Sequence, residues 1–515
     1  MLRMLACTET SQGGLSRVSE LQTIAAVDLG SNSFRLQVAR VVDDQFYPLD
    51  SLKETVRLAA GLTDNRLLDA ASRRRAIACL KLFSERLRGL PPGAVRVVGT
   101  NTLRVARNAP AFLKAAEAAL GFPIEIIAGQ EEARLIYLGV AHSLPASGTK
   151  RLVVDIGGGS AEFIIGTGFK PLAIESLYMG CVGYSQRYFP DGKITRNALD
   201  RAELAARAEV QAIAGEFSDG HWDEAIGSSG TARTLAEILE QNGFSEAGIT
   251  PDGLERLRTA MIKAGNARLL QLPGLPAERA PVLAGGFAIM AAIFRELGIR
   301  NMRIAGGALR EGVLWDLLGR IHHHDLREAT VKQFMRRYHV DMAQAKRVET
   351  LAMTLLEQLE SANPTDTEAA RLQLAWAAQL HEIGISISHA GYHRHSAYII
   401  ANADMPGFSR MEQARLSLLV RAHRGSLTKL TGMVKEREEW AAILALRLAA
   451  LFYRSRTEAE LPAIRLSMRN GKISLALPRA WLRQNPLTET LLENEAREWE
   501  SAGMAFSLAK SAGKA

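Results

Sequence analysis

Two similar segments, each an apolar strand followed by a polar glycine-containing turn and a second strand, constrain this chain more than any other feature. Residues 23–42 read TIAAVDLGSNSFRLQVARVV, and residues 151–166 read RLVVDIGGGSAEFIIG. Strand-like and helix-like stretches alternate between and after them, so we expect an α/β fold. The repeated plan predicts an internal duplication, with one copy in each half of a two-lobed unit.

The two turns carry the residue types that a phosphate site needs. Glycine lets the backbone turn tightly and expose successive N–H groups, which cradle phosphate oxygens. A strand-end aspartate can hold Mg²⁺, because this cation prefers carboxylate and water oxygens. One such turn is more often an ordinary hairpin, but two matched turns are much more specific. We therefore predict metal ligands at Asp28 and Asp155 and phosphate-binding residues at Ser31, Asn32, Ser33, Gly157, Gly158, Gly159 and Ser160.

Two later glycine motifs add candidates for the same site. GSSGT at residues 227–231 and AGGALREG at residues 305–312 each precede a helix-like stretch. A helix N-terminus that faces an anion binds it favourably, so Gly230 and Gly307 are predicted to contact phosphate. Ordinary turns at the starts of helices explain both motifs equally well. Neither of the two strand–turn–strand segments is a Walker P-loop, because no GK[ST] follows and the next element reads as a strand.

The second half of the chain changes character. From Leu326 to about Tyr453 the apolar residues recur with helical spacing. Two strands of alternating apolar and polar residues follow, joined by Asn470-Gly471, which is typical of a hairpin turn. A helix-like stretch comes after them. We expect four domains: two α/β lobes at residues 20–135 and 136–319, an all-helical domain at 320–457 and a small α/β domain at 458–515. The length of 515 residues agrees with several separate cores.

Charge and cysteine usage restrict the partners and the compartment. The net charge of +8 suits a polyanionic partner, although a role in solubility is equally consistent. Cys7, Cys79 and Cys181 lie far apart, which favours a reducing cytosol. The first twenty residues lack the apolar core of a signal peptide, and the apolar stretch at residues 441–453 is interrupted by Arg447 and too short to span a bilayer. We expect a cytoplasmic protein without a transmembrane segment.

A series of motifs, in order from about residue 25 to residue 400, resembles one known family. They are VDLGSNSFRL, GTNTLRVARN, GQEEARLIYLGV, VVDIGGGSAEF, MGCVGYSQRYFP, GSSGT, GGALREGVL and LHEIGISISHAGYHRHSAYI. They resemble the exopolyphosphatase and guanosine pentaphosphate phosphohydrolase family, within the actin, Hsp70 and sugar-kinase superfamily. The resemblance implies a duplicated actin-like (ribonuclease H-like) fold, followed by an HD-like helical domain and a small α/β domain.

The resemblance also implies an activity and its residues. The family cleaves a terminal phosphoanhydride with a water that a carboxylate activates. Glu132 of GQEEARL matches the catalytic glutamate, although from the residues alone Glu131 and Glu132 would be acids favoured by a helix N-terminus. Arg104 matches an arginine aimed at the phosphates, for which a guanidinium fork is well shaped. Glu162 is expected to hold Mg²⁺ or to orient the water. Mg²⁺ is the expected cofactor, with a monovalent cation as a further activator.

The helical domain has a His381-Glu382 pair where an HD-type phosphohydrolase has a His-Asp pair. A degenerate HD-like domain that lends positive charge is therefore favoured over a working metal site. The predicted lining of a basic channel for a long polyanion is Arg394, His395, Arg421, His423 and Arg424. A solvated basic surface is the alternative.

Exopolyphosphatase is the leading function, and the alternative is hydrolysis of the 5′-phosphate of guanosine pentaphosphate. The DIGGGS turn and the GYHRHSAYI motif favour the first. A sugar kinase or ATP-driven chaperone is disfavoured by the Glu131-Glu132 pair and the helical domain, and a nonenzymatic polyanion-binding module does not explain two phosphate turns beside acids. We expect inorganic polyphosphate as substrate, a homodimer, no nucleic-acid partner and a cytoplasmic location that includes the inner membrane face.

Overall fold

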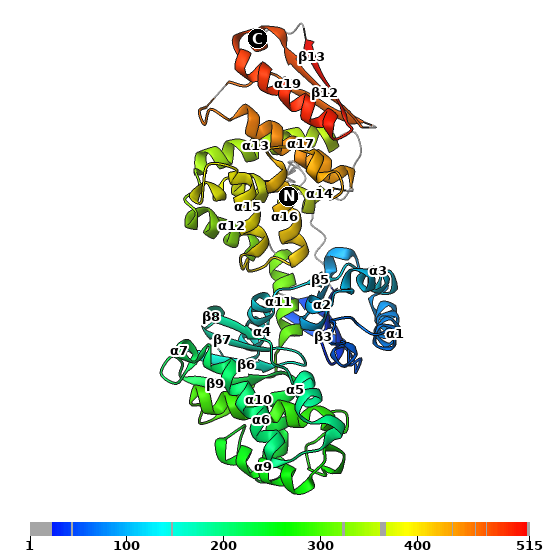
Figure 1. Ribbon diagram of the computed structural model, residues 1–515, viewed down its shortest axis with the longest axis vertical. Coiled ribbons are helices and arrows are strands. Elements are labelled where there is room, and N and C mark those ends of the chain that lie inside the picture. Colours follow the sequence, from blue (N-terminus) through cyan, green and yellow to red (C-terminus); the bar gives the residue numbers. More distant parts are fainter. Residues whose placement is uncertain are drawn as a thin grey trace, which may run out of the picture.

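The computed structural model is elongated, with the two lobes at one end and the C-terminal sheet at the other (Figure 1). It describes residues 23–42, 45–145, 148–321, 325–434, 436–458, 460–469 and 471–511, apart from residues 361–366. Cys7 and Asn470, which the sequence analysis used, lie outside these ranges.

The first lobe is built on a five-stranded sheet with the order β3-β2-β1-β4-β5. β1, β2 and β3 form an antiparallel meander, and β4 and β5 continue the sheet parallel to β1. The strands are β1 (Thr23–Leu29), β2 (Phe34–Val42), β3 (Gln45–Glu54), β4 (Val95–Gly99) and β5 (Glu125–Ile126). The helices α1 (Ala70–Leu87), α2 (Asn101–Val105) and α3 (Ala109–Leu120) belong to this lobe.

The second lobe repeats this topology strand for strand. Its sheet has the order β8-β7-β6-β9-β10, with the same antiparallel meander and the same two parallel additions. The strands are β6 (Arg151–Ile156), β7 (Ala161–Thr167), β8 (Lys170–Leu177), β9 (Glu224–Ser228) and β10 (Met302–Ile304). The helices are α5 (Cys181–Tyr188), α6 (Arg196–Gln211), α7 (Ala214–Phe217), α8 (Ser229–Gln241), α9 (Pro251–Ala264) and α10 (Ala280–Leu297). The predicted duplication is confirmed, and with it the actin-like architecture.

Two helices, α4 (Gly129–Ser143) and α11 (Leu309–Ile321), join the lobes. One cluster of buried side chains contains residues from both sheets, such as Ile24 and Val153, together with residues of both helices. The helices meet backbone to backbone, because a Cβ atom on Gly139 of α4 would overlap the carbonyl oxygen of Ala308 and lie 2.8 Å from the nitrogen of Gly312. This crossing fixes the lobes relative to each other.

α11 continues beyond the lobes into the helical region (Figure 1). That region consists of α12 (Leu326–Arg337), α13 (Met342–Glu360), α14 (Thr367–Leu380), α15 (Tyr392–Asn402), α16 (Arg410–Ala422) and α17 (Arg437–Phe452). Short 3-10 helices occur at Ala59–Gly61, Pro92–Ala94, Pro190–Gly192, Ala267–Leu269, Ile383–Ser386 and Thr428–Leu430. The predicted lobe boundary at residue 319 therefore falls inside α11.

The C-terminal region adds a three-stranded sheet in the order β11-β12-β13. Its elements are β11 (Arg465–Arg469), β12 (Lys472–Pro478), α18 (Arg479–Gln484), α19 (Pro486–Ser501) and β13 (Ala505–Ser511). β11 and β12 form the predicted antiparallel pair, while β13, parallel to β12, was not predicted. Its buried residues share one continuous cluster with those of α12 to α17, and buried Arg447 pairs with Glu495 of α19 at 2.5 Å.

One described helix, α10, is long and apolar enough to cross a membrane by length and composition. Its most apolar window is 72% buried, in the core of the second lobe. Sequence analysis had considered only the apolar stretch in α17.

Candidate active site

A cleft between the lobes contains both glycine turns. It is lined by Asp28 and the first turn, by Asp155 and the second turn, and by Glu132 at the start of α4. The turns approach each other closely: a Cβ atom on Gly158 would lie 2.9 Å from the Cβ of Ser31. The second turn closes on itself through a hydrogen bond from the nitrogen of Gly157 to the carbonyl oxygen of Ser160, 2.9 Å long. The two repeats therefore meet at a single site.

The first turn is held from its own lobe. The hydroxyl of Thr102 donates to the hydroxyl of Ser31 at 2.8 Å. The nitrogens of Arg57 and Ala59 donate to the carbonyl oxygens of Asn32 and Ser31, at 2.7 and 2.9 Å. With its carbonyl groups paired outward, the turn is rigid before any anion binds.

Two aspartates stand at the ends of β1 and β6. Burial raises the pKa of Asp28 to about 6, although Arg35 and Arg310 oppose the shift. Its Oδ1 atom is buried without a hydrogen-bond partner. Burial also raises the pKa of Asp155, and hydrogen bonds from Ser229 and Ser228 oppose this. An orphaned buried carboxylate oxygen is costly unless a cation pairs with it.

These residues fit a Mg²⁺ ion that is shared with the substrate. No group of three or more His, Cys, Asp or Glu side chains in the described ranges is arranged to hold a metal by itself. Mg²⁺ is commonly bound by one or two carboxylates together with water and phosphate oxygens. Asp28 and Asp155, with the orphaned oxygen of Asp28, are the residues of this cleft that meet that description.

Glu132 extends from the first turn of α4 into the cleft. Its Oε2 atom accepts a hydrogen bond of 3.2 Å from Nη1 of Arg104, which also donates to the carbonyl oxygen of Ile127 at 2.8 Å. Burial raises the pKa of Glu132 to about 7, against the pull of Arg104. A general base works best when its pKa is near the working pH, and Glu132 meets this condition.

Glu162 lies on β7 beside Glu132 and shares its electrostatic environment. Burial raises the pKa of Glu162 well above its usual value, and Glu132 is the next cause. The hydroxyl of Ser176 donates to Oε1 of Glu162 at 3.0 Å. Two neighbouring buried carboxyls do not both ionise easily, and a nearby cation would favour the charged form of both.

Glu131, the neighbour of Glu132 in sequence, does not line the cleft. Both of its oxygens accept hydrogen bonds of 2.8 Å from Arg134, and Oε2 also accepts one of 2.9 Å from the nitrogen of Gly407. The helix thus turns one acid of the pair toward the cleft and the other toward the helical region.

Three arginines of the cleft were missed by the sequence analysis: Arg35, Arg279 and Arg310. Arg310 pairs with Glu311 at 2.7 Å at the start of α11. The guanidinium of Arg279 fills the space where a side chain on Gly230 would lie, so a larger residue there would displace it. Arg35 and Arg310 belong to motifs that were recognised, whereas the sequence around Arg279 carries no local signal.

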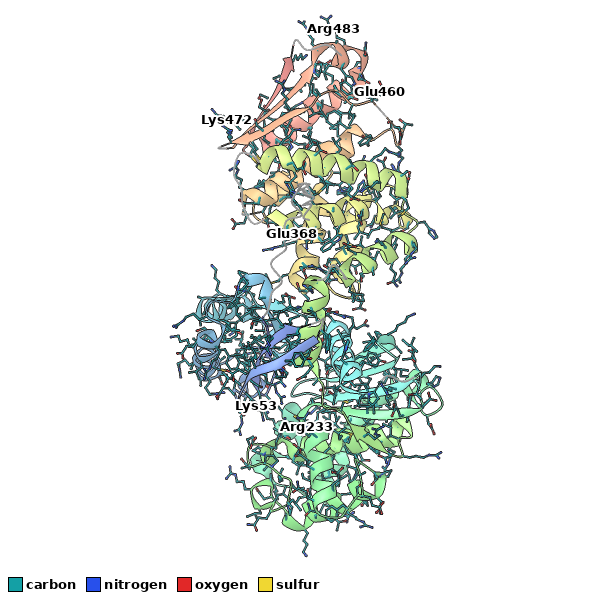
Figure 2. The ribbon with its side chains drawn as sticks, turned by 180° about the vertical axis from the view of Figure 1, so that it is seen from behind. Lys53, Arg233, Glu368, Glu460, Lys472 and Arg483 are labelled. Carbon is teal, nitrogen blue, oxygen red and sulfur yellow. The ribbon has the colours of Figure 1, made fainter. Side chains whose placement is uncertain are left out.

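The cleft is bridged at its rim by Lys53 of β3 and Glu278 of the second lobe, 3.6 Å apart. Figure 2 shows Lys53 at the edge of the first lobe that borders the second. Burial lowers the pKa of Lys53, followed by the nearby charges of Arg279 and Arg35. Lys53, Arg279 and Arg35 therefore lie close enough to influence one another's charge.

Backbone strain marks the start of α8. Ser229 has φ of 62°, a left-handed conformation that residues other than glycine rarely adopt. The hydroxyl of Thr231 donates to the carbonyl oxygen of Ile156 at 2.8 Å and ties this start to β6. Strain of this kind is often found at functional sites.

Not all predicted residues come together. Gly307 lies at the α4–α11 crossing, where a Cβ atom would overlap the carbonyl oxygen of Gly139, and it does not line the cleft. Gly159 faces Asn101, with a hypothetical Cβ 2.7 Å from its Oδ1. The geometry gives Gly307 a packing role, and contact with phosphate stays a prediction for both glycines.

The predicted channel residues lie in the helical region. Arg394, Arg421 and Arg424 are exposed and His395 is half-buried. The prediction for His423 is wrong, because its side chain is 4% exposed and burial lowers its pKa well below the usual value. This neutral side chain contacts the Tyr392 hydroxyl at 3.3 Å.

The predicted channel is also separate from the cleft. Arg421 and Arg424 lie at the C-terminal end of α16, whose 13 residues span about 20 Å. The N-terminal end of this helix is the one that faces the lobes, through β5. In the degenerate pair, His381 contacts the carbonyl oxygen of Ala378 at 2.7 Å, and Glu382 pairs with Arg456 at 2.6 Å.

The duplicated lobes and the cleft of glycine turns and carboxylates define a protein of the actin-like class that handles phosphate groups. Within this class, the model of the Ppx/GppA phosphatase family matches residues 37–321, and the model of Ppx/GppA phosphatase domain III matches residues 326–496. The chain belongs to the Ppx/GppA phosphatase family.

Solved structures share the fold of part of the chain. An exopolyphosphatase from Cytophaga hutchinsonii has a TM-score of 0.53 and 24% identity, over 58% of this chain and 98% of its own. An exopolyphosphatase-like protein has a TM-score of 0.52 and 22% identity, over 57% of this chain and 97% of its own. The helical and C-terminal regions extend beyond what these proteins contain.

Proposed function

We propose that this protein is an exopolyphosphatase, which releases orthophosphate from the ends of inorganic polyphosphate in a Mg²⁺-dependent reaction. The observation that carries the proposal is the placement of Glu132. This buried carboxylate faces two glycine turns, is held by Arg104 at 3.2 Å and has a pKa raised by burial to about 7. Membership of a phosphatase family and the exopolyphosphatases among the solved structures support the same chemistry.

Each group of residues in the cleft has its own role in the hydrolysis. The N–H groups of the two turns bind the oxygens of the terminal phosphate, and Arg35 and Arg310 balance its charge. Glu132 takes a proton from a water whose oxygen bonds to the terminal phosphorus. The bond from that phosphorus to the bridging oxygen breaks, and the shortened chain leaves with the bridging oxygen. Arg104 holds the Glu132 carboxylate in place.

Asp28 and Asp155 would hold the Mg²⁺ ion, with Glu162 as the third candidate. When bound, the ion neutralises charge on the phosphate oxygens. The orphaned Oδ1 of Asp28 is the structural support for this part of the proposal.

Cations near the rim favour a chain of phosphates over a nucleotide. Arg279 lines the cleft, and Lys53 lies near Arg279, paired with Glu278. A polyphosphate chain carries charge along its whole length, whereas guanosine pentaphosphate places an uncharged nucleoside between its phosphate groups. The alternative function, removal of the 5′-phosphate of guanosine pentaphosphate, is kept because the family name covers both activities.

The test is phosphate release from long-chain polyphosphate, guanosine pentaphosphate and ATP by the full-length protein with Mg²⁺. The proposal predicts the highest kcat/KM on polyphosphate. A higher kcat/KM on guanosine pentaphosphate would favour the alternative, and preference for ATP would contradict both.

The proposal includes a cytoplasmic location and a homodimer. Cys79 and Cys181 are buried free thiols, as expected for a reducing compartment. Sedimentation of the purified protein would test the dimer.

A further inference from the structure

A buried ion network lies behind the active site, where the lobes meet the helical region. Arg134 of α4 binds Glu131 through two hydrogen bonds of 2.8 Å and also pairs with Asp316 of α11. Asp316 in turn pairs with Arg96 of β4 at 2.6 Å and with Arg320 at 3.0 Å. Arg96, Arg134, Glu131 and Asp316 are each less than a tenth exposed. The network therefore joins β4, α4 and α11 through direct ion pairs.

The helical region meets this network at Gly407, and the charges of Glu412 and Asp325 also act on Arg320. The nitrogen of Gly407 donates to Oε2 of Glu131 at 2.9 Å, and its carbonyl oxygen accepts from Nη2 of Arg320 at 2.8 Å. Gly407 has φ of 88°, which favours glycine. It lies directly before the capped start of α16, where Ser409 and Glu412 form a capping box. Both the N–H and the carbonyl group of Gly407 therefore form hydrogen bonds with residues of α4 and α11.

The position of Glu131 in α4 gives this contact a functional meaning. An α-helix has about 3.6 residues per turn, so Glu131 and Glu132 lie on the same turn. Their side chains point about 100° apart. The first turn of a helix has N–H groups without intrahelical partners and is normally held by a capping side chain. Ala128, the N-cap residue of α4, offers no such side chain. The hydrogen bonds from Arg134 and Gly407 to the Glu131 side chain fix this turn instead.

We infer that Glu131 is a positioning residue, which holds the catalytic Glu132 in place through α4 and makes that position depend on the helical region through Gly407. The inference rests on the proposed function, because it assigns Glu132 the role of base. Glu131 itself touches neither the cleft nor the substrate.

The charges of the network explain why loss of the Glu131 charge should move the first turn of α4. Three arginines, Arg96, Arg134 and Arg320, face the carboxylates of Glu131, Asp316 and the partly exposed Glu125. Neutralising Glu131 leaves Arg134 with Asp316 as its remaining partner, and a buried cation draws such a partner toward it. We expect the first turn of α4 to shift and to carry Glu132 away from Arg104.

The test compares Glu131→Gln with Glu125→Gln in the full-length protein. Both changes remove one carboxylate that faces Arg96, at 3.9 and 3.2 Å, but Glu125 lies on β5 and not on α4. We expect Glu131→Gln to lower kcat for phosphate release from long-chain polyphosphate about 10- to 100-fold, the range for a small misplacement of a reacting group. KM should change less than about twofold, and Glu125→Gln should leave both constants near wild type.

Two further measurements separate positioning from general damage. The dissociation constant for long-chain polyphosphate, measured in the inactive Glu132→Gln background, should be the same with and without Glu131→Gln. If Glu131→Gln does not fold, the double variant Glu131→Gln/Arg134→Gln removes one charge of each sign and should still lower kcat, because both variants lose the carboxylate that binds Gly407. Thermal unfolding of each variant identifies the folded ones.

The outcomes distinguish the inference from the proposed function. A folded Glu131→Gln protein, or a folded double variant, with wild-type kcat would overturn the inference alone. Equal losses in Glu131→Gln and Glu125→Gln would also overturn it, because the network would then act as a whole and not through α4. A wild-type protein that releases no phosphate from any phosphoanhydride would overturn the proposed function, and the inference with it.

Discussion

Replacing Gly139 by alanine should force α4 and α11 apart and so lower both stability and activity. The added methyl group would overlap the carbonyl oxygen of Ala308 and lie 2.8 Å from the nitrogen of Gly312. Neither obstacle is the end of a flexible side chain, because both belong to the backbone at the start of α11. The clash can be relieved only if one helix moves.

The magnitude follows from what lies between the helices. Overpacking a tight core costs about 1–3 kcal/mol. We place Gly139→Ala at about 3 kcal/mol, because the methyl group meets two backbone atoms and separates buried side chains such as Leu135 and Val313. At about 2–4 °C per kcal/mol, the unfolding transition of the lobes should fall by about 6–12 °C.

Calorimetry and phosphate release would measure the two effects. Gly183→Ala is the matched control, because Gly183 lies in helix α5 and a Cβ there meets nothing within 4 Å. That change should raise stability by about 0.4–1 kcal/mol, since alanine restricts the unfolded chain. If Gly139→Ala unfolded at the wild-type temperature with wild-type kcat, the reasoning about the crossing would be refuted.

Three further predictions concern the cleft and the helical region. Glu132 must be ionised to accept a proton, and burial raises its pKa to about 7. The value of kcat/KM should therefore fall about tenfold for each pH unit below 7 and become constant above it. A flat profile between pH 5 and 8 would contradict this. Asp155→Asn should weaken the dependence on Mg²⁺, and an unchanged magnesium titration would show that Asp155 only shapes the turn. A fragment that ends after Ile321, the last residue of α11, should still attack short polyphosphates, but with a lowered kcat because Glu131 loses its contact with Gly407. It should also lose the preference for long chains and the steep salt dependence, because Arg394, Arg421 and other cations are removed; the chain-length profile of the full protein in an active fragment would disprove this.

The sequence was sufficient for elements with a strong local signal. The two turns could be predicted because glycine and strand-end aspartate mark them, and the pairing of β11 with β12 could be predicted from the alternating strands on either side of Asn470-Gly471. The edge strands β3 and β8 and the last strand β13 were missed. Edge strands are partly exposed and lack a continuous apolar pattern, and β13 is recognisable only by its pairing with β12.

The site shows the same division between local and tertiary information. Glu131 and Glu132 are equivalent in sequence, and only the helix and its neighbours assign one to the cleft and the other to Gly407. Arg279 reaches the cleft from a segment that is remote in sequence from both turns, so no spacing could reveal it. His423 looks basic in sequence, yet it is buried among other side chains and stays neutral. Burial depends on the packing of the whole domain and is not encoded in a local motif.

The catalytic role of Glu132 is the central claim, and Glu132→Gln tests it most directly. The change keeps the size of the side chain and an acceptor for Arg104, whose Nη1 lies 3.2 Å from Oε2, but it removes the base. Phosphate release and polyphosphate binding would be measured on the same preparation. We predict a fall in kcat of about 10²–10⁴-fold with a nearly unchanged dissociation constant for polyphosphate. Turnover near that of the wild type would contradict the account.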